Sequence, residues 1–429
     1  MADRLTAELL IEDLTTAERE RATRVESVLG SLREAAVEAD RLAEFPMQHV
    51  STLSEAGLLG LVVPTQFGGL GGGLRDLAAA TFAMGTACPS TALAYFFQCS
   101  SASRGLLPLE ALAAGLFPDP DEAAQVRSFA TKVLSRLGED GRWMANFASE
   151  SAKSSTASIT ISTAATRTDG GGGGWRLDGV KSFGCATGVA DDYLVTAKLP
   201  GGDSAEHLGV FIVDRNAAGV SERARWDAIG MRASATHGIV LDGVQVDAED
   251  ALAVPGAFLK MMQMSRGSFV GSQLAGTAVY VGAAHAVYDF TMNHLTTTTF
   301  ADSGLAIGTS PFQQQLVGQM RTSLDTALMW LRRQIALETS EPPIWPKGDV
   351  VRNWRLAKGA IAEATFDVGV NAMKACGTSN TGNSGIIARS LRDLSMGLVQ
   401  AFPPEKGRLE AASSLIVGHE STQFGTGAT

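Results

Sequence analysis

A block of strand pattern between two long blocks of helix pattern is the feature that most constrains the fold of this chain. Apolar runs at residues 193–197 and 210–213 are bounded by Gly, Pro and Asp, which is typical of short strands. The run Gly170 to Gly174 suits neither a helix nor a strand, because glycine loses the most backbone freedom on folding. It predicts a hairpin tip. We therefore expect a compact antiparallel β unit over roughly residues 146–246.

Helical periodicity occupies the chain on both sides of this unit. Apolar residues recur at intervals of three and four, with Ala, Leu and Met dominant, as in packed amphipathic helices. The segments with this spacing are 18–43, 74–94, 251–293, 311–338, 351–376 and 385–399. A proline-rich stretch at 342–346 predicts a break between two of them.

This order predicts an α+β protein built from three units. A length of 429 residues suits two or three domains. We expect an N-terminal α-helical domain at residues 1–140, a middle β domain at 141–250 and a C-terminal helical bundle at 251–429.

Composition excludes several classes of protein. A formal net charge of -10 and a pI near 5.2 argue against a nucleic-acid partner, which usually requires a basic surface. Apolar runs are too short to span a membrane, and the first residues carry acids instead of the basic region of a secretion signal. We therefore expect a cytoplasmic protein. The four cysteines lack CxxC spacing, so we expect free thiols and no metal site.

Three segments, taken in order, resemble the acyl-CoA dehydrogenase superfamily. They are FPMQHVSTLSEAGLLGLVVPTQFGGLGGG (45–73), the β segment with DGVKSFGCATGVADDYLV and WDAIGMRASATHGIVLDGVQV, and Arg389-Ser-Leu-Arg392-Asp393. The resemblance implies an N-terminal helical domain, a middle antiparallel β-barrel-like domain and a C-terminal four-helix bundle. It also implies a homodimer or homotetramer that holds a flavin beside the β domain.

Residues of the β segment match family positions that contact the flavin. Phe147 and Ser149 lie in the strand that meets the isoalloxazine and the substrate carbonyl in relatives, and Ser149 is the predicted donor. Phe183 stands where relatives usually place Trp against the flavin. Cys185 stands where they place Thr or Ser near its N5 edge. Because a thiol is a weaker hydrogen-bond donor than a hydroxyl, this position predicts a modified flavin pocket.

Further cofactor positions lie in the C-terminal half. Phe312 with Gln313, and Cys376 with Gly377, resemble downstream elements that contact FAD in the family. Many relatives also carry Arg-x-x-Phe-Gly, whose Arg reaches the cofactor pyrophosphate, but this chain has Thr297-Thr-Thr-Phe300-Ala301. Losing one charge-assisted contact weakens FAD binding without forbidding it. FAD is therefore the first expectation and FMN the alternative.

Substrate positions follow from the same resemblance. Ser149, Arg232, Ser234 and Arg389 are the candidates, whereas Arg392 and Asp393 are expected to serve a structural role as an adjacent pair. The helical stretch at 91–98 lines the acyl pocket in relatives, although ordinary core packing explains it equally well.

The base that an acyl-CoA dehydrogenase requires is missing from both usual positions. Removal of the α proton of a thioester needs a carboxylate in an apolar site. The position nine residues beyond Arg392 is Ala401, and the alternative position in the bundle is Ser272. Glu405 is the substitute that a longer loop would bring back to the site.

These gaps leave three hypotheses open. The first is dehydrogenation of an acyl thioester on CoA or a carrier protein, with hydride transfer to flavin N5 and an electron-transfer partner. The second is a monooxygenase that receives reduced flavin from a flavin reductase, although the loop at 398–407 lacks the histidine often found in such hydroxylases. The third is a flavin-free binding relative. The fold alone does not choose among them.

Overall fold

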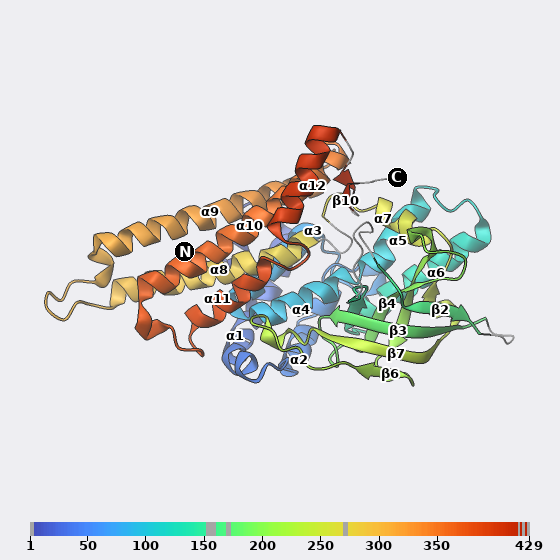
Figure 1. The fold of residues 1–429 in the computed structure, drawn as a ribbon, viewed down its shortest axis with the longest axis horizontal. Coiled ribbons are helices and arrows are strands. Elements are labelled where there is room, and N and C mark those ends of the chain that lie inside the picture. Colours follow the sequence, from blue (N-terminus) through green and yellow to red (C-terminus); the bar gives the residue numbers. More distant parts are fainter. Residues whose placement is uncertain are drawn as a thin grey trace.

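The computed structural model describes residues 4–151, 160–168, 173–268 and 273–418, together with the backbone of residues 421–422 and 425–426. Helices fill the chain on both sides of a single large sheet (Figure 1). The α+β class and the order of the three blocks are therefore confirmed. None of the helices in these ranges is long and apolar enough to cross a membrane.

Helix boundaries agree with the periodicity except at two places. The helices are α1 (Thr16–Leu42), α2 (Gln48–Glu55), α3 (Leu74–Ala87), α4 (Pro89–Ser100), α5 (Ser103–Ala113), α6 (Pro120–Gly138), α7 (Ala257–Gln263), α8 (Gln273–Thr297), α9 (Pro311–Thr339), α10 (Lys347–Cys376), α11 (Ile386–Gly397) and α12 (Pro404–Val417). The expected helix at 74–94 is two helices, because Pro89 forces Cys88 into an extended conformation and starts a new helix. The segment at 251–293 begins as a strand, not as a helix.

In the described part of the chain, eight strands form one mixed sheet, and β9 (Ser421–Thr422) and β10 (Gly425–Thr426) pair separately. The strands of the mixed sheet are β1 (Met144–Phe147), β2 (Ala164–Arg167), β3 (Trp175–Gly184), β4 (Asp192–Lys198), β5 (Leu208–Asp214), β6 (Val220–Glu222), β7 (His237–Val246) and β8 (Ala251–Leu252). Their order is β6-β7-β3-β2-β4-β5-β8, and β1 pairs with β4. The predicted hairpin is confirmed by the antiparallel β2–β3 pair, although residues 170–172 of its tip lie outside the described residues. The sheet is not purely antiparallel, because β4 pairs with β1 and β2 in parallel.

Both faces of the central strands are buried, which explains their continuous apolar runs. Phe211 and Val213 of β5 face the main core, which the sheet shares with the N-terminal helices and the bundle. Val210 and Ile212 of the same strand face a second core with residues of α5, α6 and α7.

The C-terminal helices α8, α9, α10 and α11 pack together as the expected four-helix bundle (Figure 1). Helix α3 packs along α8, and α4 lies between the bundle and the sheet. The four cysteines are free and buried, as the sequence predicts. The site described below lies where α4, α8, α11 and the end of β3 meet.

Candidate active site

A break in the β3–β7 ladder turns an aromatic side chain outward. The register shifts once between Leu177 and Gly179, and again between Lys181, which pairs with Ile239, and Gly184, which pairs with His237. Phe183 lies within this irregularity and is 51% exposed. Its ring meets the Trp226 ring edge to face, with centroids 5.9 Å apart. The end of β3 therefore presents an apolar face on which a planar ring system can stack.

Phe147 supports this strand end from below. Its ring is fully buried and packs against Tyr193 with ring centroids 4.8 Å apart. An added Cβ at Gly184 would lie 2.3 Å from the Phe147 ring, so only glycine fits there. Phe147 thus acts through packing in this structure, and any flavin contact from it would use the backbone.

A buried ion pair fixes the segment that leaves β1. Lys181 Nζ donates to Glu150 Oε1 at 2.7 Å, and both side chains are at least 98% buried, with exposures of 0% and 2%. Burial alone would raise the pKa of Glu150, but hydrogen bonds from Lys181 and Ser162 hold it at about 2. Ser149 is exposed, and its carbonyl accepts from the Ser182 amide at 2.9 Å. The pair therefore positions Ser149 next to Phe183.

Cys185 belongs to a chain of three side chains. Ser234 Oγ donates to the Met231 carbonyl at 2.7 Å, which uses its only proton. Thr236 must then donate to Ser234 at 2.6 Å, and Cys185 Sγ must donate to Thr236 at 3.0 Å. Burial raises the pKa of Cys185 to about 12, so the thiol keeps its proton. Because that proton is already engaged, a ligand beside Cys185 meets sulfur lone pairs and not a donor.

Ser234 is consequently a supporting residue. It is fully buried, and both of its hydrogen bonds stay inside the protein. The structure does not place its hydroxyl where a substrate would reach it.

The loop at 226–232 docks on α11. Met231 has a left-handed backbone (φ 50), and its amide donates to Asp393 Oδ1 at 2.6 Å. The preceding Gly230 lies so close to α11 that an added Cβ would be 2.1 Å from the Arg392 carbonyl oxygen. Asp393 therefore holds the loop, and Arg392 pairs with Asp40 instead of with Asp393. Arg392 and Asp393 therefore both have structural contacts, as expected. They do not pair with each other.

Arg232 is also engaged in this docking. Its Nε donates to the Asp40 carbonyl at 3.0 Å, and Nη1 donates to the Ala228 carbonyl at 3.3 Å. Asp40 in α1 thus joins Arg232 of the β domain to Arg392 of the bundle. Because Nε and Nη1 both bind backbone carbonyls, Arg232 forms an interdomain contact, and its role toward a substrate stays a prediction.

The carboxyl group of Asp393 makes stability depend on pH. Burial raises its pKa to about 7, against the opposing hydrogen bond from Met231. Between its usual pKa and about pH 7 the folded protein therefore holds a proton that the unfolded chain has released, so stability falls as pH rises. Asp393→Asn keeps the acceptor oxygen and removes the titration. We expect the variant to gain up to about 1.4 kcal/mol relative to the wild type for each pH unit in this window.

Urea unfolding of both proteins at about pH 5 and about pH 7 measures this difference. Glu38→Gln, which changes an exposed carboxylate on α1 whose pKa is lowered by Arg41, is the control and should leave the pH dependence in this window unchanged. If the free energy of unfolding changes with pH in the same way in wild type and Asp393→Asn, then Asp393 has the same pKa in the folded and unfolded protein, and the prediction is wrong.

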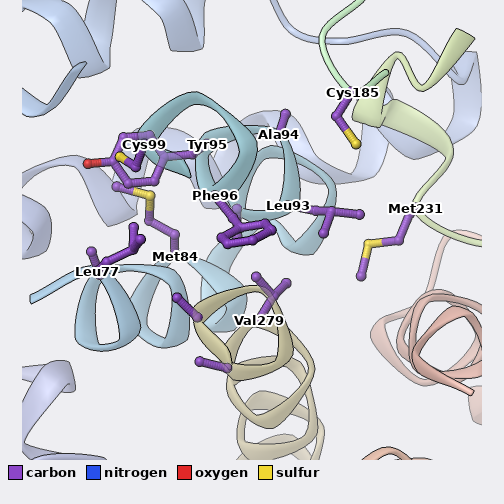
Figure 2. Packing of buried hydrophobic residues seen from close by; sticks show 14 of the residues in the cluster. Leu77, Met84, Leu93, Ala94, Tyr95, Phe96, Cys99, Cys185, Met231 and Val279 are labelled. Atoms are coloured by element: carbon purple, nitrogen blue, oxygen red, sulfur yellow. The ribbon is translucent and has the colours of Figure 1, made fainter. Parts of the chain in front are cut away.

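Apolar residues of α4 close the inner side of the site. Figure 2 shows Leu93 extending toward Met231, with Cys185 on the same side of α4. Tyr95 and Phe96 turn away into the core: the Tyr95 hydroxyl donates to the Leu58 carbonyl at 2.7 Å, and Phe96 packs against Gly276 of α8. Within the stretch at 91–98, Leu93 therefore faces the site while its aromatic neighbours stabilise the core.

Four predicted cofactor residues lie elsewhere in the chain. Phe312 and Gln313 begin α9, and Cys376 and Gly377 end α10, at the end of the bundle far from the β domain (Figure 1). Phe312 is 60% exposed, whereas Cys376 is buried beside Thr291 at 3.7 Å. One chain does not bring these residues to Phe183. They would contact the same flavin only if a second copy presented this end of its bundle.

Glu405 does not join the site either. It lies in the first turn of α12 with 77% of its side chain exposed, and its carboxylate is 3.6 Å from Arg408. Proton abstraction from a thioester needs a carboxylate inside an apolar pocket, and Glu405 lies on the surface. Ala401 is exposed, and Ser272 lies outside the described residues.

Arg389 and Tyr280 each carry a buried hydrogen-bond donor with no partner among the described residues. Arg389 lies one helical turn before Asp393, and its Nη1 is buried without a partner among the described residues. The Tyr280 hydroxyl of α8 is likewise buried and unpartnered in that part of the chain. The sequence suggested Arg389 but not Tyr280. The available signal was a tyrosine inside an otherwise small and apolar helical stretch.

Comparison with family models matches three parts of the chain. The acyl-CoA dehydrogenase N-terminal domain matches residues 18–108, the middle domain matches residues 145–244 and the C-terminal domain matches residues 274–402.

Individual relatives include enzymes of different activity. L-evernosamine nitrososynthase of Micromonospora sp. is 29% identical over 277 residues, which cover 64% of this chain and 61% of that enzyme. The putative acyl-CoA dehydrogenase YdbM of Bacillus subtilis is 24% identical over 397 residues, covering 89% of this chain and 92% of the relative. The solved structure of KijD3 with FMN and dTDP-3-amino-2,3,6-trideoxy-4-keto-3-methyl-D-glucose has a TM-score of 0.78 and 25% identity, covering 97% of both chains.

Proposed function

Since this chain belongs to the acyl-CoA dehydrogenase family of flavoenzymes, we propose that it is a reduced-flavin-dependent monooxygenase acting on a small organic substrate. The observation that carries this proposal is the lack of a carboxylate at either of the two base positions that the family usually uses. Ala401 stands at one usual base position, Ser272 at the other, and Glu405 is exposed on α12. A monooxygenase needs no carboxylate to remove an α proton. Similarity to a nitrososynthase supports the same reading.

The residues at the end of β3 fit a flavin. Phe183 offers an exposed apolar face at the strand end, where a register shift interrupts the β3–β7 pairing. Leu93 and Met231 limit access of water from the α4 side. Bound reduced flavin supplies two electrons for the reduction of O2, of which one atom enters the substrate and the other leaves as water. A flavin reductase that oxidises NADH is the matching partner.

We favour FMN over FAD as the cofactor. Thr297 replaces the arginine that meets the FAD pyrophosphate in many relatives. FMN has neither the second phosphate nor the adenosine, so it does not need that contact. KijD3, which this chain resembles along nearly its whole length, was solved with FMN.

One observation favours a dehydrogenase instead. Asp393 is a buried carboxyl group with a pKa of about 7, a value that suits a general base. Its hydrogen bond to the Met231 amide ties it to the docking of the loop. Dehydrogenation with a displaced base therefore remains the second hypothesis, with Asp393 in place of Glu405.

Oxygen labelling tests the proposed reaction. The protein is mixed with FMN, NADH, a flavin reductase and isotopically labelled O2, together with the amino-sugar nucleotide bound by KijD3 and a panel of simple ketones, carboxylic acids, amines and aryl sulfides. We expect at least one product that carries one labelled oxygen atom and forms only when the protein is present. The reductase and FMN alone control for free peroxide. If no member of the panel is oxygenated while acyl-CoAs are desaturated, the proposal is wrong.

A further inference from the structure

Tyr280 is buried in a way that folding alone does not explain. Every residue of α8 from 274 to 284 is buried, and Tyr280 is 2% exposed. The other hydroxyl in this stretch, Thr277, donates to the Gln273 carbonyl at 3.3 Å. Tyr280 Oη has no hydrogen-bond partner among the described residues. Because an unpaired buried hydroxyl destabilises a protein and buried tyrosines usually find a partner, this group points to an absent ligand.

The ring of Tyr280 is held against α11. An added Cβ at Gly397 would lie 3.1 Å from the Tyr280 ring, so the two helices touch at this point. Gly397, Asp393 and Arg389 are spaced four residues apart and share one face of α11. Asp393 on this face binds the Met231 amide. This face of α11 therefore contacts both α8 and the loop at 226–232.

Arg389 brings a second unpaired donor to this face. Its Nη1 is buried and has no hydrogen bond or ion pair within the described chain. The groups around it are Asp393, which is engaged by Met231, and the buried thiol of Cys88. An arginine keeps its charge, so this donor requires an acceptor or a negative charge.

Electrostatics keeps Tyr280 in its donor form. Burial, with Cys185 and Asp393 nearby, raises its pKa well above the usual value. The proximity of Cys185 also places the hydroxyl beside the predicted flavin position. The charge of Asp393 acts on Tyr280, and that of Arg389 acts on Asp393, so both unpaired donors lie near this carboxyl group. Figure 2 shows Cys185, Leu93 and Met231 on the same side of α4.

We propose that Tyr280 and Arg389 together bind an oxyanion or carbonyl oxygen of the substrate, with Leu93 and Met231 contacting its apolar part. Neither residue reacts: both position the substrate beside the flavin. This inference deepens the proposed function, because it specifies what the same site recognises. It assigns as preferred substrates organic acids or ketones with an apolar portion, and it disfavours compounds whose only polar group is a cation.

Binding of three probes with the same tail tests this assignment. Hexanoate, hexanol and hexylamine are titrated into the oxidised, FMN-loaded protein, and calorimetry and the flavin spectrum report binding. We expect hexanoate to bind at least about tenfold more tightly than hexylamine. Tyr280→Phe should weaken hexanoate binding about tenfold, and Arg389→Met about ten- to a hundredfold, as expected for charge-assisted hydrogen bonds. Hexylamine binding should not change in either variant.

The stability of Tyr280→Phe provides a second test, because the variant would lose stability if the Tyr280 hydroxyl had a purely structural role. Tyr280→Phe removes an unpaired buried hydroxyl, so without ligand its midpoint of urea unfolding should equal or exceed that of the wild type. Tyr288→Phe, on the same helix but only partly buried, is the matched control and should leave hexanoate binding unchanged. Equal hexanoate affinity in wild type and Tyr280→Phe would overturn the assignment.

The outcome is separable from that of the proposed function. Binding to the oxidised protein requires no turnover, so preference for hexanoate can persist when no oxygenated product forms. In that case the monooxygenase proposal fails and the recognition site stands. Conversely, oxygenation of a probe together with unselective binding of all three compounds would refute the recognition site alone.

Discussion

Replacing Lys181 with methionine should lower the free energy of unfolding by about 3–5 kcal/mol, the loss typical of a buried charge pair that loses one partner. Glu150 would keep a carboxylate that is 2% exposed, with Ser162 and Thr163 as its remaining donors. Lys198→Met on β4 is the control, because its partner Asp203 is 90% exposed and the pair contributes at most about 1 kcal/mol. Urea unfolding of both variants gives the comparison.

Lys181→Met should also affect the proposed flavin site. Glu150 and Lys181 hold the chain after β1 so that the Ser149 carbonyl meets the Ser182 amide, next to Phe183. We therefore expect weaker FMN binding in Lys181→Met, and recovery of stability when Glu150→Gln is added to the same chain. Since the pKa of Glu150 is held at about 2, the wild type should also lose this stabilisation as pH falls below about 4.5. A Lys181→Met protein as stable as the wild type would contradict the role of the pair.

Gly230→Ala should destabilise the protein by about 3 kcal/mol, near the upper end for an overpacked site. The added Cβ would lie 2.1 Å from the Arg392 carbonyl oxygen and 2.8 Å from the Asp393 amide nitrogen. Both are backbone atoms that cannot rotate away, so the loop must separate from α11. The Met231–Asp393 hydrogen bond would lengthen or break, and the Cys185–Thr236–Ser234 chain, which ends on the Met231 carbonyl, would shift.

Gly30→Ala provides the comparison for this substitution. Gly30 lies within α1, with nothing within 4 Å of an added Cβ, so alanine should raise stability there by about 0.5–1 kcal/mol. Thermal unfolding distinguishes the two variants. If Gly230→Ala unfolds at the same temperature as the wild type, the loop does not depend on this close approach.

Local patterns predicted the element types because periodicity is a local property. The strands around Tyr193 and Val210 and four of the six expected helical segments occupy the positions that their spacing indicates. Which strands pair with each other depends on residues far apart in the sequence. The parallel pairing of β1 with β4 was invisible in the alternation, since the same strand pattern fits either direction. Pro89 marks the break between α3 and α4, but it lies within a continuous apolar run whose periodicity predicts one helix.

The candidate site was only partly predictable for the same reason. Phe183 and Cys185 are predicted as flavin positions because they lie in a recognisable string. Asp40 gave no such signal: it contacts Arg232 and Arg392, which are 192 and 352 residues away in the sequence. Phe312 and Cys376 were assigned to the flavin from the resemblance, yet a single chain places them at the distant end of the bundle.

Anaerobic mixing of the FMN-loaded protein with acyl-CoAs of several chain lengths tests the central claim most directly. The absorbance of the oxidised flavin is followed after each addition, and reduction by a flavin reductase with NADH shows afterwards that the flavin is still competent. Because no carboxylate occupies either usual base position, we predict that no acyl-CoA bleaches the flavin. Bleaching by any acyl-CoA would contradict the monooxygenase account and establish dehydrogenation, and its loss in Asp393→Asn would then identify the base.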